Sequence, residues 1–533
     1  MADPAFPTRQ YPYRAPDPTA GPDPAAAVAL APGTVHRFVL GVDPVPRPLT
    51  ADELDALNDP VATALLRRGV FPQTARELLA ALDALGAQGL PVQESYVVGD
   101  GGQIPWTPET AGVARQLRVV VSRRATLGAQ PDLLMSTSTA LDAPEAFLQV
   151  LGWDAVAGVF RYYERRDGTW IVAGTSWDAL REPSRGRGPF DSHVNGALVM
   201  KELKLPWSHW HSQSASITPA VLAPDDPIRT EPIWTERTGA ENFEVAVAQP
   251  GVFRWTRSRF DQVIGADGTV TALPELLRQV LTTTTVNLVS SVAESTTVAR
   301  LDRLELPMTF FLDVDAFAGP LGMTPPAAPT VAGPAYDAAR TQLELHLDDG
   351  AGFRRPGETF FAFLVPERAL EDQMVLDELI TREVLSVRLA TCLLLVDLAN
   401  PVWSDRRAAL LAHVPATVAA GNGGAALDEL LGTAIEAAAT TPEGPEAEFV
   451  QWWTGSEEPD FAQRVQARLT EFLDAWQRRL DGPDGAVDLL RLAQGRRRRF
   501  RDSQLAEFAL TVPRSPVDDA ARALRVGPDA SVS

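Results

Sequence analysis

Apolar residues recur every three or four positions in two parts of the chain, near its beginning and through its last third. This spacing places them on one side of a helix and predicts short helices at 49–57, 61–70 and 74–89. The first helix starts with Thr50 followed by Glu53, the pattern of a capping box. A second helical region is predicted after residue 366, with helices at 367–399, 406–414, 425–439 and 461–480.

The middle of the chain has the shorter, β-branched patterns that are typical of strands. Strands are predicted at 116–124, 244–255 and 308–317. A hairpin is predicted at 157–176, because the Asp167–Gly168 pair in its centre favours the tight turn between two antiparallel strands. The stretch 273–296 begins as a helix and passes into a Thr-rich part whose state the pattern leaves open.

These patterns predict an α+β fold, with helices gathered on both sides of a strand-rich centre. In chain order we expect a disordered Pro/Ala-rich tail, a helical cap, a strand-rich central domain, a helical C-terminal region and a flexible tail, at 1–30, 31–114, 115–365, 366–515 and 516–533. The pattern does not decide whether the helical region is a separate domain.

The chain carries 69 acidic and 48 basic residues, which gives a formal net charge of −21. This balance argues against nucleic acid as a partner, because such binding needs a basic surface. One basic run exists, Arg496–Arg499. We expect it to be a solvated helix face, with an anion-binding or nucleic-acid-binding patch as the alternative.

The single cysteine, Cys392, leaves no possibility of an intramolecular disulfide or a cysteine-based zinc or redox site. Cysteine scarcity favours a reducing compartment, and the N-terminus has no basic start followed by an apolar core, so we expect a cytoplasmic protein. The longest apolar stretch, Leu389–Ala399, is too short for a bilayer and contains Asp397, so we expect no membrane span.

The basic residues are unevenly divided by type: 46 are arginine and two are lysine, at positions 201 and 204. Both lysines fall within 190–212, which also holds three of the six histidines. This chain uses arginine almost everywhere that a surface cation suffices. A remaining lysine therefore points to a need for a compact amine that can lose its proton. We expect the functional site in this segment.

A strand around His209 would place Trp207, His209 and His211 on one face, because side chains alternate along a strand. Two imidazoles spaced in this way can bind one metal ion, with His193 or Glu202 as a further ligand. Such a donor set suits a mononuclear transition metal, namely iron, copper, zinc or manganese. Alternatively, the histidines and neighbouring tryptophans form a hydrogen-bonded layer of the core.

Lys201 has two interpretations that depend on the local structure. In a strand it lies between apolar residues, where the loss of water lowers the pKa of an amine and favours its nucleophilic form. It can equally form an ion pair with Glu202 or lay its stem along apolar surface. In a helix, Lys201 and Lys204 share a face, and no special burial is expected.

Two shorter motifs have weaker functional content. Asp313 and Asp315 have the spacing of some metal–nucleotide sites, but a strand with a polar face explains them equally well. Arg185 and Arg187, next to glycines, could lie in an anion-binding loop or a simple turn. The sequence has no phosphate-binding loop, no dinucleotide-binding fingerprint and no serine-nucleophile motif.

The sequence therefore favours an enzyme that acts on a small molecule with the help of a metal or cofactor, an oxidoreductase rather than a hydrolase. In this hypothesis Lys201 and Glu202 are catalytic, Arg187, Trp207 and Trp210 contact the substrate, and the three histidines hold the metal. The competing hypothesis is a non-catalytic scaffold or binding protein, in which this segment is core or a partner surface. The substrate and the oligomeric state stay open.

Overall fold

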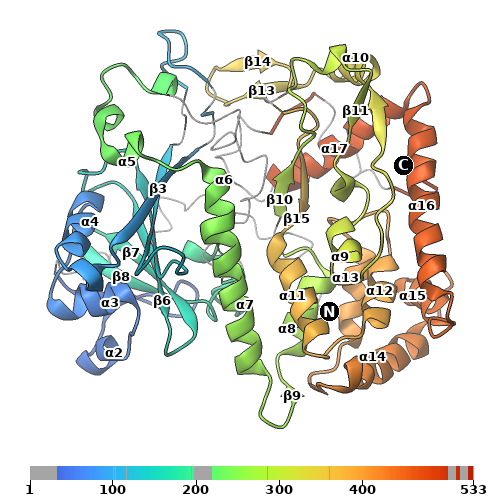
Figure 1. The fold of residues 1–533 in the computed structure, drawn as a ribbon, viewed down its shortest axis with the longest axis horizontal. Coiled ribbons are helices and arrows are strands. Elements are labelled where there is room, and N and C mark those ends of the chain that lie inside the picture. Colours follow the sequence, from blue (N-terminus) through green and yellow to red (C-terminus); the bar gives the residue numbers. More distant parts are fainter. Residues whose placement is uncertain are drawn as a thin grey trace.

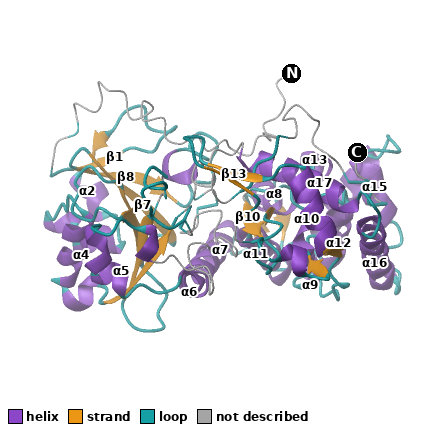
Figure 2. Cartoon of the chain, turned by 90° about the horizontal axis from the view of Figure 1, so that it is seen from above, coloured by secondary structure: helices purple, strands orange, loops and turns teal. Residues whose placement is uncertain are grey.

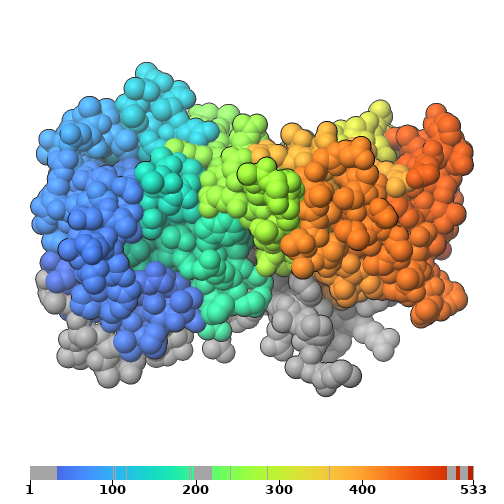
Figure 3. Space-filling model, turned by 90° about the horizontal axis from the view of Figure 1, so that it is seen from below, coloured from blue at the N-terminus to red at the C-terminus, as the bar shows by residue number. Residues whose placement is uncertain are grey.

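The protein was analysed as a computed structural model that describes residues 30, 33–99, 101–102, 104–113, 115, 117–191, 193, 195–196, 219–284, 286–358, 361–501, 512–516, 526–527 and 529–531. Within these residues the predicted α+β class is confirmed. A large mixed sheet occupies one half of the molecule and a body of helices the other (Figures 1 and 2). Figure 3 shows the two halves as adjoining lobes, one blue to green and one orange to red.

The sheet is an antiparallel meander of six strands, extended by two strands from the beginning of the chain. Its strand order is β2-β1-β8-β7-β6-β5-β4-β3, and β1 runs parallel to β8. The strands are β1 (Val35–Arg37), β2 (Arg47–Pro48), β3 (Val92–Val98), β4 (Arg118–Arg124), β5 (Leu133–Ser138), β6 (Leu148–Asp154), β7 (Val159–Arg166) and β8 (Thr169–Thr175). The region expected to be a helical cap therefore also supplies β1, β2 and β3.

The predicted hairpin is confirmed, because β7 and β8 pair with Arg166 opposite Thr169. The two residues between them, Asp167 and Gly168, have φ values of 47° and 78°. Left-handed backbone at both positions gives the two-residue turn whose twist matches that of the strands. The strand predicted at 116–124 is confirmed as β4.

Short helices cover the sheet near the beginning of the chain. They are α2 (Ala51–Asp55), α3 (Pro60–Ala64) and α4 (Ala75–Asp83), which lie beside the sheet in Figure 1. The predicted capping box is present: the Thr50 side chain accepts from the Glu53 backbone N–H, and the Glu53 carboxylate accepts from the Thr50 backbone. Leu78 and Leu82 of α4 are fully buried and share a core with the sheet.

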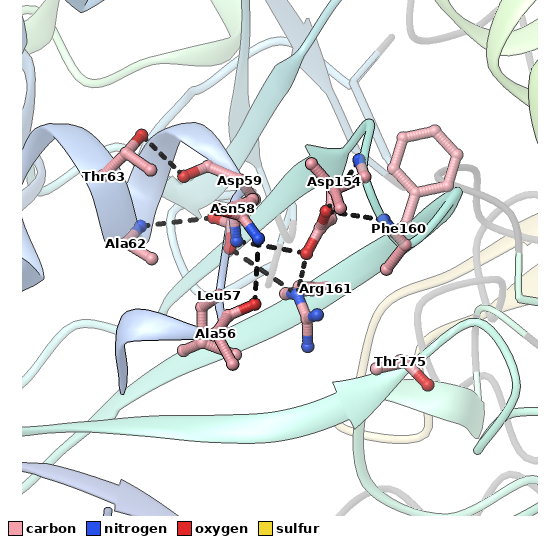
Figure 4. Close-up of polar contacts among 12 residues, drawn as sticks. Ala56, Leu57, Asn58, Asp59, Ala62, Thr63, Asp154, Phe160, Arg161 and Thr175 are labelled. Carbon is pink, nitrogen blue, oxygen red and sulfur yellow. Dashed lines mark hydrogen bonds and ion pairs between the residues drawn. The ribbon is translucent and has the colours of Figure 1, made fainter. Parts of the chain in front are cut away.

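A buried polar cluster ties this helical layer to the sheet (Figure 4). The Asp59 carboxylate accepts from backbone N–H groups at the start of α3 and from the Tyr163 hydroxyl, at 2.5 Å. Arg161 of β7 donates to Asp154 at 2.7 Å. Gly152 makes room for this cluster, because a Cβ there would lie 2.5 Å from Asp59 Oδ1. Each buried charge here has partners, so the cluster is structural.

One long helix joins the two halves, and it lies between β7 and the helices of the second half (Figure 1). It consists of α6 (Ala240–Phe243), the π-helical turn η7 (Glu244–Ala248) and α7 (Gln249–Val263). Pro250 has no N–H for the usual bond to Ala246, and the Gln249 N–H instead bonds the Glu244 carbonyl, which widens the turn.

The strand predicted at 244–255 is therefore wrong. The sequence alternates apolar and polar residues only briefly there. The buried residues of this stretch and of the rest of α7 instead follow a helical stripe, Val247, Val252, Trp255, Arg259 and Val263. The longer helical pattern decides the local structure, because it buries more apolar surface than the short alternation could.

The second half is built from α8 (Leu273–Leu281), α9 (Val314–Ala318), α10 (Gly333–Gln342), α11 (Leu370–Thr381), α12 (Val387–Leu395), α13 (Asp405–Ala409), α14 (Ala425–Ala438), α15 (Pro445–Trp453), α16 (Phe461–Leu480) and α17 (Gly485–Arg501). Small two-stranded sheets connect them, among which β10 (Val286–Val289) pairs with β15 (Val365–Arg368). The helices predicted between 367 and 480 are confirmed. This half has its own apolar core, which includes Cys392.

The prediction of a strand at 308–317 is wrong, because a 3-10 turn at Met308–Phe310 leads into α9. Three consecutive residues, Phe310, Phe311 and Leu312, are all buried, which an alternating strand face does not allow. Asp313 and Asp315 therefore do not share a strand face. The Asp313 carboxylate forms an ion pair with Arg368 instead.

The basic run at 496–499 also differs from the expected solvated face. Arg496 and Arg497 of α17 are buried. Arg497 donates to the Leu364 carbonyl and to Gln494, and Arg496 donates to the Phe310 carbonyl and lies over that ring. Leu364 and Phe310 are distant in sequence, so the charge pattern alone could not reveal them as partners. Among the described helices, none is long and apolar enough to cross a membrane.

Candidate functional site

The predicted site residues fall partly within the described residues. His193 and Arg187 are described, whereas Lys201, Glu202, Trp207, His209, Trp210 and His211 lie outside the described residues. Arg187 is exposed, in the turn that precedes η3 (Gly188–Asp191), and its neighbour Arg185 is buried. Arg185 donates to the Leu180 carbonyl, so part of this basic pair stabilises the turn itself.

His193 lies in the interior, at the start of the predicted site. The residue is 7% exposed, and its ring packs edge-on against Tyr162 of β7, with 5.3 Å between the ring centroids. Phe190 packs against the same tyrosine ring at 5.1 Å. Burial raises the pKa of the Tyr162 hydroxyl well above its ordinary value. The surroundings of His193 are therefore aromatic and shielded from water.

The two described residues that follow are fixed by hydrogen bonds from both halves of the molecule. The Trp255 indole N–H donates to the Asn195 carbonyl at 2.7 Å, and the Asn195 side-chain amide donates to Thr284 at 2.9 Å. The Ser176 hydroxyl donates to the Gly196 carbonyl at 2.6 Å. Gly196 has φ +76°, and a Cβ there would lie 2.4 Å from the Ser176 carbonyl oxygen, so this position requires glycine.

From Asn195 a chain of buried hydrogen bonds continues into the helical half. Thr284 donates from its hydroxyl to Asp372 Oδ1 at 2.6 Å and from its backbone to Oδ2 at 3.2 Å. The Gln279 amide donates to Asp372 at 3.2 Å, and its oxygen accepts from Arg259. We call Asn195, Thr284, Asp372, Gln279 and Arg259 the junction network. It joins α7, α8 and α11 to the chain that leads out of His193.

Burial and charged neighbours of both signs act on the two ionisable groups of the junction network. Burial raises the pKa of Asp372, and the nearby Arg368 opposes that shift. Burial, followed by the charge of Arg278, lowers the pKa of Arg259 to about 9, and the charges of Glu275 and Asp372 oppose this shift. Within the described residues Arg259 forms no ion pair, and its Nε and Nη2 atoms have no hydrogen-bond partner.

A carboxyl group that titrates near neutrality lies next to this network. Glu371, in the first turn of α11, is 7% exposed, and burial raises its pKa from 4.5 to about 8, with the Asp372 charge adding to the shift. A carboxyl with such a pKa can carry a proton at neutral pH and release it. The surroundings of the site thus contain one candidate acid–base group and one candidate cation.

A separate cavity of about 1000 Å³ lies in the helical half, lined among others by Asp397, Trp403 and Trp452. Its charged residues largely neutralise one another. Each of its three arginines pairs with a carboxylate, as Arg406 does with Glu448 at 3.0 Å, so these arginines are already engaged and do not favour an acidic ligand. We therefore place the candidate site where the segment that begins at His193 joins the junction network through Asn195, rather than in this cavity.

Sequence reasoning missed the junction network because its members come from four separate stretches of chain. One signal was present: Arg259 lies four residues after Trp255, in the apolar stripe of a helix. Arg278 and Gln279 likewise interrupt the apolar pattern of α8. A polar residue in a buried stripe indicates a partner elsewhere in the fold, although it does not identify that partner.

A search against protein-family models, curated proteins and solved structures found no match to this chain.

Proposed function

We propose that this chain is an enzyme that acts on a small molecule with the help of a metal ion or another cofactor, at the segment that begins at His193. The supporting observation is the anchoring of Asn195 and Gly196 by hydrogen bonds from Ser176, Trp255 and Thr284. Functional groups act best when neighbouring residues hold them in place. Asn195 and Gly196 are held in place at the start of the proposed site, next to the buried His193, and this supports a functional role for the segment.

The roles of the site residues follow from the sequence. The metal would be a mononuclear transition metal, and its proposed ligands are His193, His209 and His211. Glu202 acts as a fourth ligand or as a base, and Lys201 acts as a proton donor or anion clamp. Among the described residues no group of three side chains could hold a metal ion, so this part of the proposal depends on His209 and His211.

We propose an oxidoreductase rather than a hydrolase. Aromatic surroundings such as Tyr162 and Phe190 support this choice, because they exclude water from the position of His193. A cytoplasmic location belongs to the same proposal and rests on the single cysteine.

Metal analysis and an absorption spectrum of the freshly purified full chain test this proposal. We expect metal in the wild type and its loss in the H209A/H211A double variant. A matched control is H413A, because His413 lies in the helical half, where it pairs with Glu446 at 3.0 Å. The H413A variant should retain the metal. A wild type without stoichiometric metal or chromophore, and a double variant with the same spectrum, would contradict the proposal.

The second candidate function is a non-catalytic scaffold or binding protein. The buried, edge-on contact between His193 and Tyr162 favours it, because a core layer would use histidine in the same way. A substitution of His193 by phenylalanine separates the two functions. A scaffold has no metal to lose, so only its unfolding midpoint can change, whereas the proposed enzyme loses metal affinity.

A further inference from the structure

Arg259 presents one edge of its guanidinium group without a partner among the described residues. Nη1 donates to Gln279, which is itself held by Asp372. Nε and Nη2, the two nitrogens on the opposite edge, have no hydrogen-bond acceptor, although the residue is only 2% exposed. This edge offers two parallel N–H groups, the arrangement that grips a carboxylate or phosphoryl group with two hydrogen bonds.

Arg123 shows how this chain satisfies a buried arginine when the role is structural. It is 1% exposed, and each of its three nitrogens donates, to Gln93, to the Gly89 carbonyl and to Asp83. Arg259 has the same burial without this set of partners. A buried guanidinium group with two unpaired nitrogens and no carboxylate in direct contact is unfavourable, so its retention points to an anion that binds there.

Charged neighbours of both signs surround Arg259. Arg278 has the largest effect and disfavours the charged form, whereas Glu275 and Asp372 favour it without accepting a hydrogen bond from Nε or Nη2. The Asp372 carboxylate is bonded instead to Thr284 and Gln279. Gln279 orients the guanidinium group by holding Nη1. The network thus fixes the direction in which the Nε–Nη2 edge points, as a recognition residue requires.

We infer that the Nε–Nη2 edge of Arg259 binds an oxyanion, the carboxylate or phosphoryl group of a small acidic molecule. Its identification as the substrate rests on the proposed function, because Asn195 connects this network to the segment that begins at His193. The anion site itself requires no metal. Arg259 is a binding residue, and Gln279 and Asp372 are positioning residues that act through it.

The test is the unfolding midpoint of the full chain as a function of inorganic phosphate or acetate, with the ionic strength held constant by chloride. We expect the wild-type midpoint to rise with at least one of the two anions, because a ligand that binds the folded state stabilises it. The anion that acts identifies the group, phosphoryl or carboxylate. R259M should lower the affinity at least about tenfold, since two charged hydrogen bonds are lost.

Two further variants keep the test decisive. R259K retains the charge without the two-pronged edge and should bind the anion much more weakly than the wild type. R123M is the matched control: it should lower the midpoint, because it removes satisfied contacts, and yet keep the anion-dependent rise. In buffer without either anion, R259M should be at least as stable as the wild type, since a buried charge with two unpaired nitrogens is removed.

The inference is overturned if neither anion shifts the wild-type midpoint, or if R259M and R259K keep the full shift. A protein that contains neither metal nor chromophore but shows the Arg259-dependent shift would overturn the proposed enzyme and leave the anion site standing. A protein that contains metal but shows no anion-dependent shift would leave the proposed enzyme standing and overturn the anion site.

Discussion

Glu371 should make the stability of this protein fall as the pH rises. Its pKa is raised from 4.5 to about 8, mainly by burial, so the folded state resists ionisation of this carboxyl. Below about pH 4.5 the group is protonated in both states and has no effect. Between about pH 4.5 and 8 the unfolded chain loses its proton and the folded chain keeps it, which favours unfolding. Above about pH 8 the effect is complete.

The size of this effect follows from the shift. At about 1.4 kcal/mol for each pKa unit, the difference between 4.5 and about 8 corresponds to about 4–5 kcal/mol of lost stability. Glu371→Gln removes the titrating group and keeps the shape. The free energy of unfolding of this variant, relative to the wild type, should therefore increase steadily across that pH range and then level off.

Urea unfolding at a series of pH values measures this difference directly. Comparison of the two proteins cancels the contribution of every other titrating group that the substitution leaves unchanged. The control is Glu429→Gln on the exposed face of α14, which should leave the pH dependence of stability as it is. A constant difference between E371Q and the wild type across the range would refute the reasoning about Glu371.

Three substitutions test the packing around the site and the sheet, each by urea unfolding. Gly196→Ala should lower the free energy of unfolding by about 1–3 kcal/mol, because it strains a left-handed residue and places a Cβ 2.4 Å from a carbonyl oxygen. Gly112→Ala is the control and should change stability little, because a Cβ there meets open space. Tyr163→Phe should cost about 1–3 kcal/mol, since the buried Asp59 carboxylate loses the hydroxyl at 2.5 Å, and an unchanged stability would contradict the structural role of that cluster. Thr284→Val should cost a similar amount of about 1–3 kcal/mol and should also weaken anion binding at the junction network, and a variant with normal binding would show that the network does not orient Arg259.

Local signals in the sequence predicted the parts of the fold that depend on neighbouring residues. The Thr50–Glu53 capping box and the Asp167–Gly168 turn are correct because their bonds span only a few residues. The prediction at 244–255 is wrong because a short alternation competes with a longer helical stripe, and Pro250 is accommodated by a π-helical turn. The parallel pairing of β1 with β8 brings together residues too distant in sequence for any local pattern to predict.

The same distinction explains which part of the candidate site the sequence could locate. Residue types marked the segment that begins at His193, because lysine and histidine are rare in this chain. The junction network depends on the packing of α7 against α11, which brings Arg259 and Asp372 into one chain of hydrogen bonds. A run of basic residues is also not always solvent-exposed. Arg497 belongs to such a run and is fully buried.

The most direct test of the central claim is reconstitution of the full chain, stripped of metal by a chelator, with iron, copper, zinc or manganese in turn. If the proposed function is correct, one of these ions binds at one equivalent per chain. His193→Ala should then weaken the binding by about tenfold or more, as expected for the loss of a ligand. Binding of none of these ions to the stripped wild type, or equal binding by the His193→Ala variant, would contradict the claim that a metal site begins at His193.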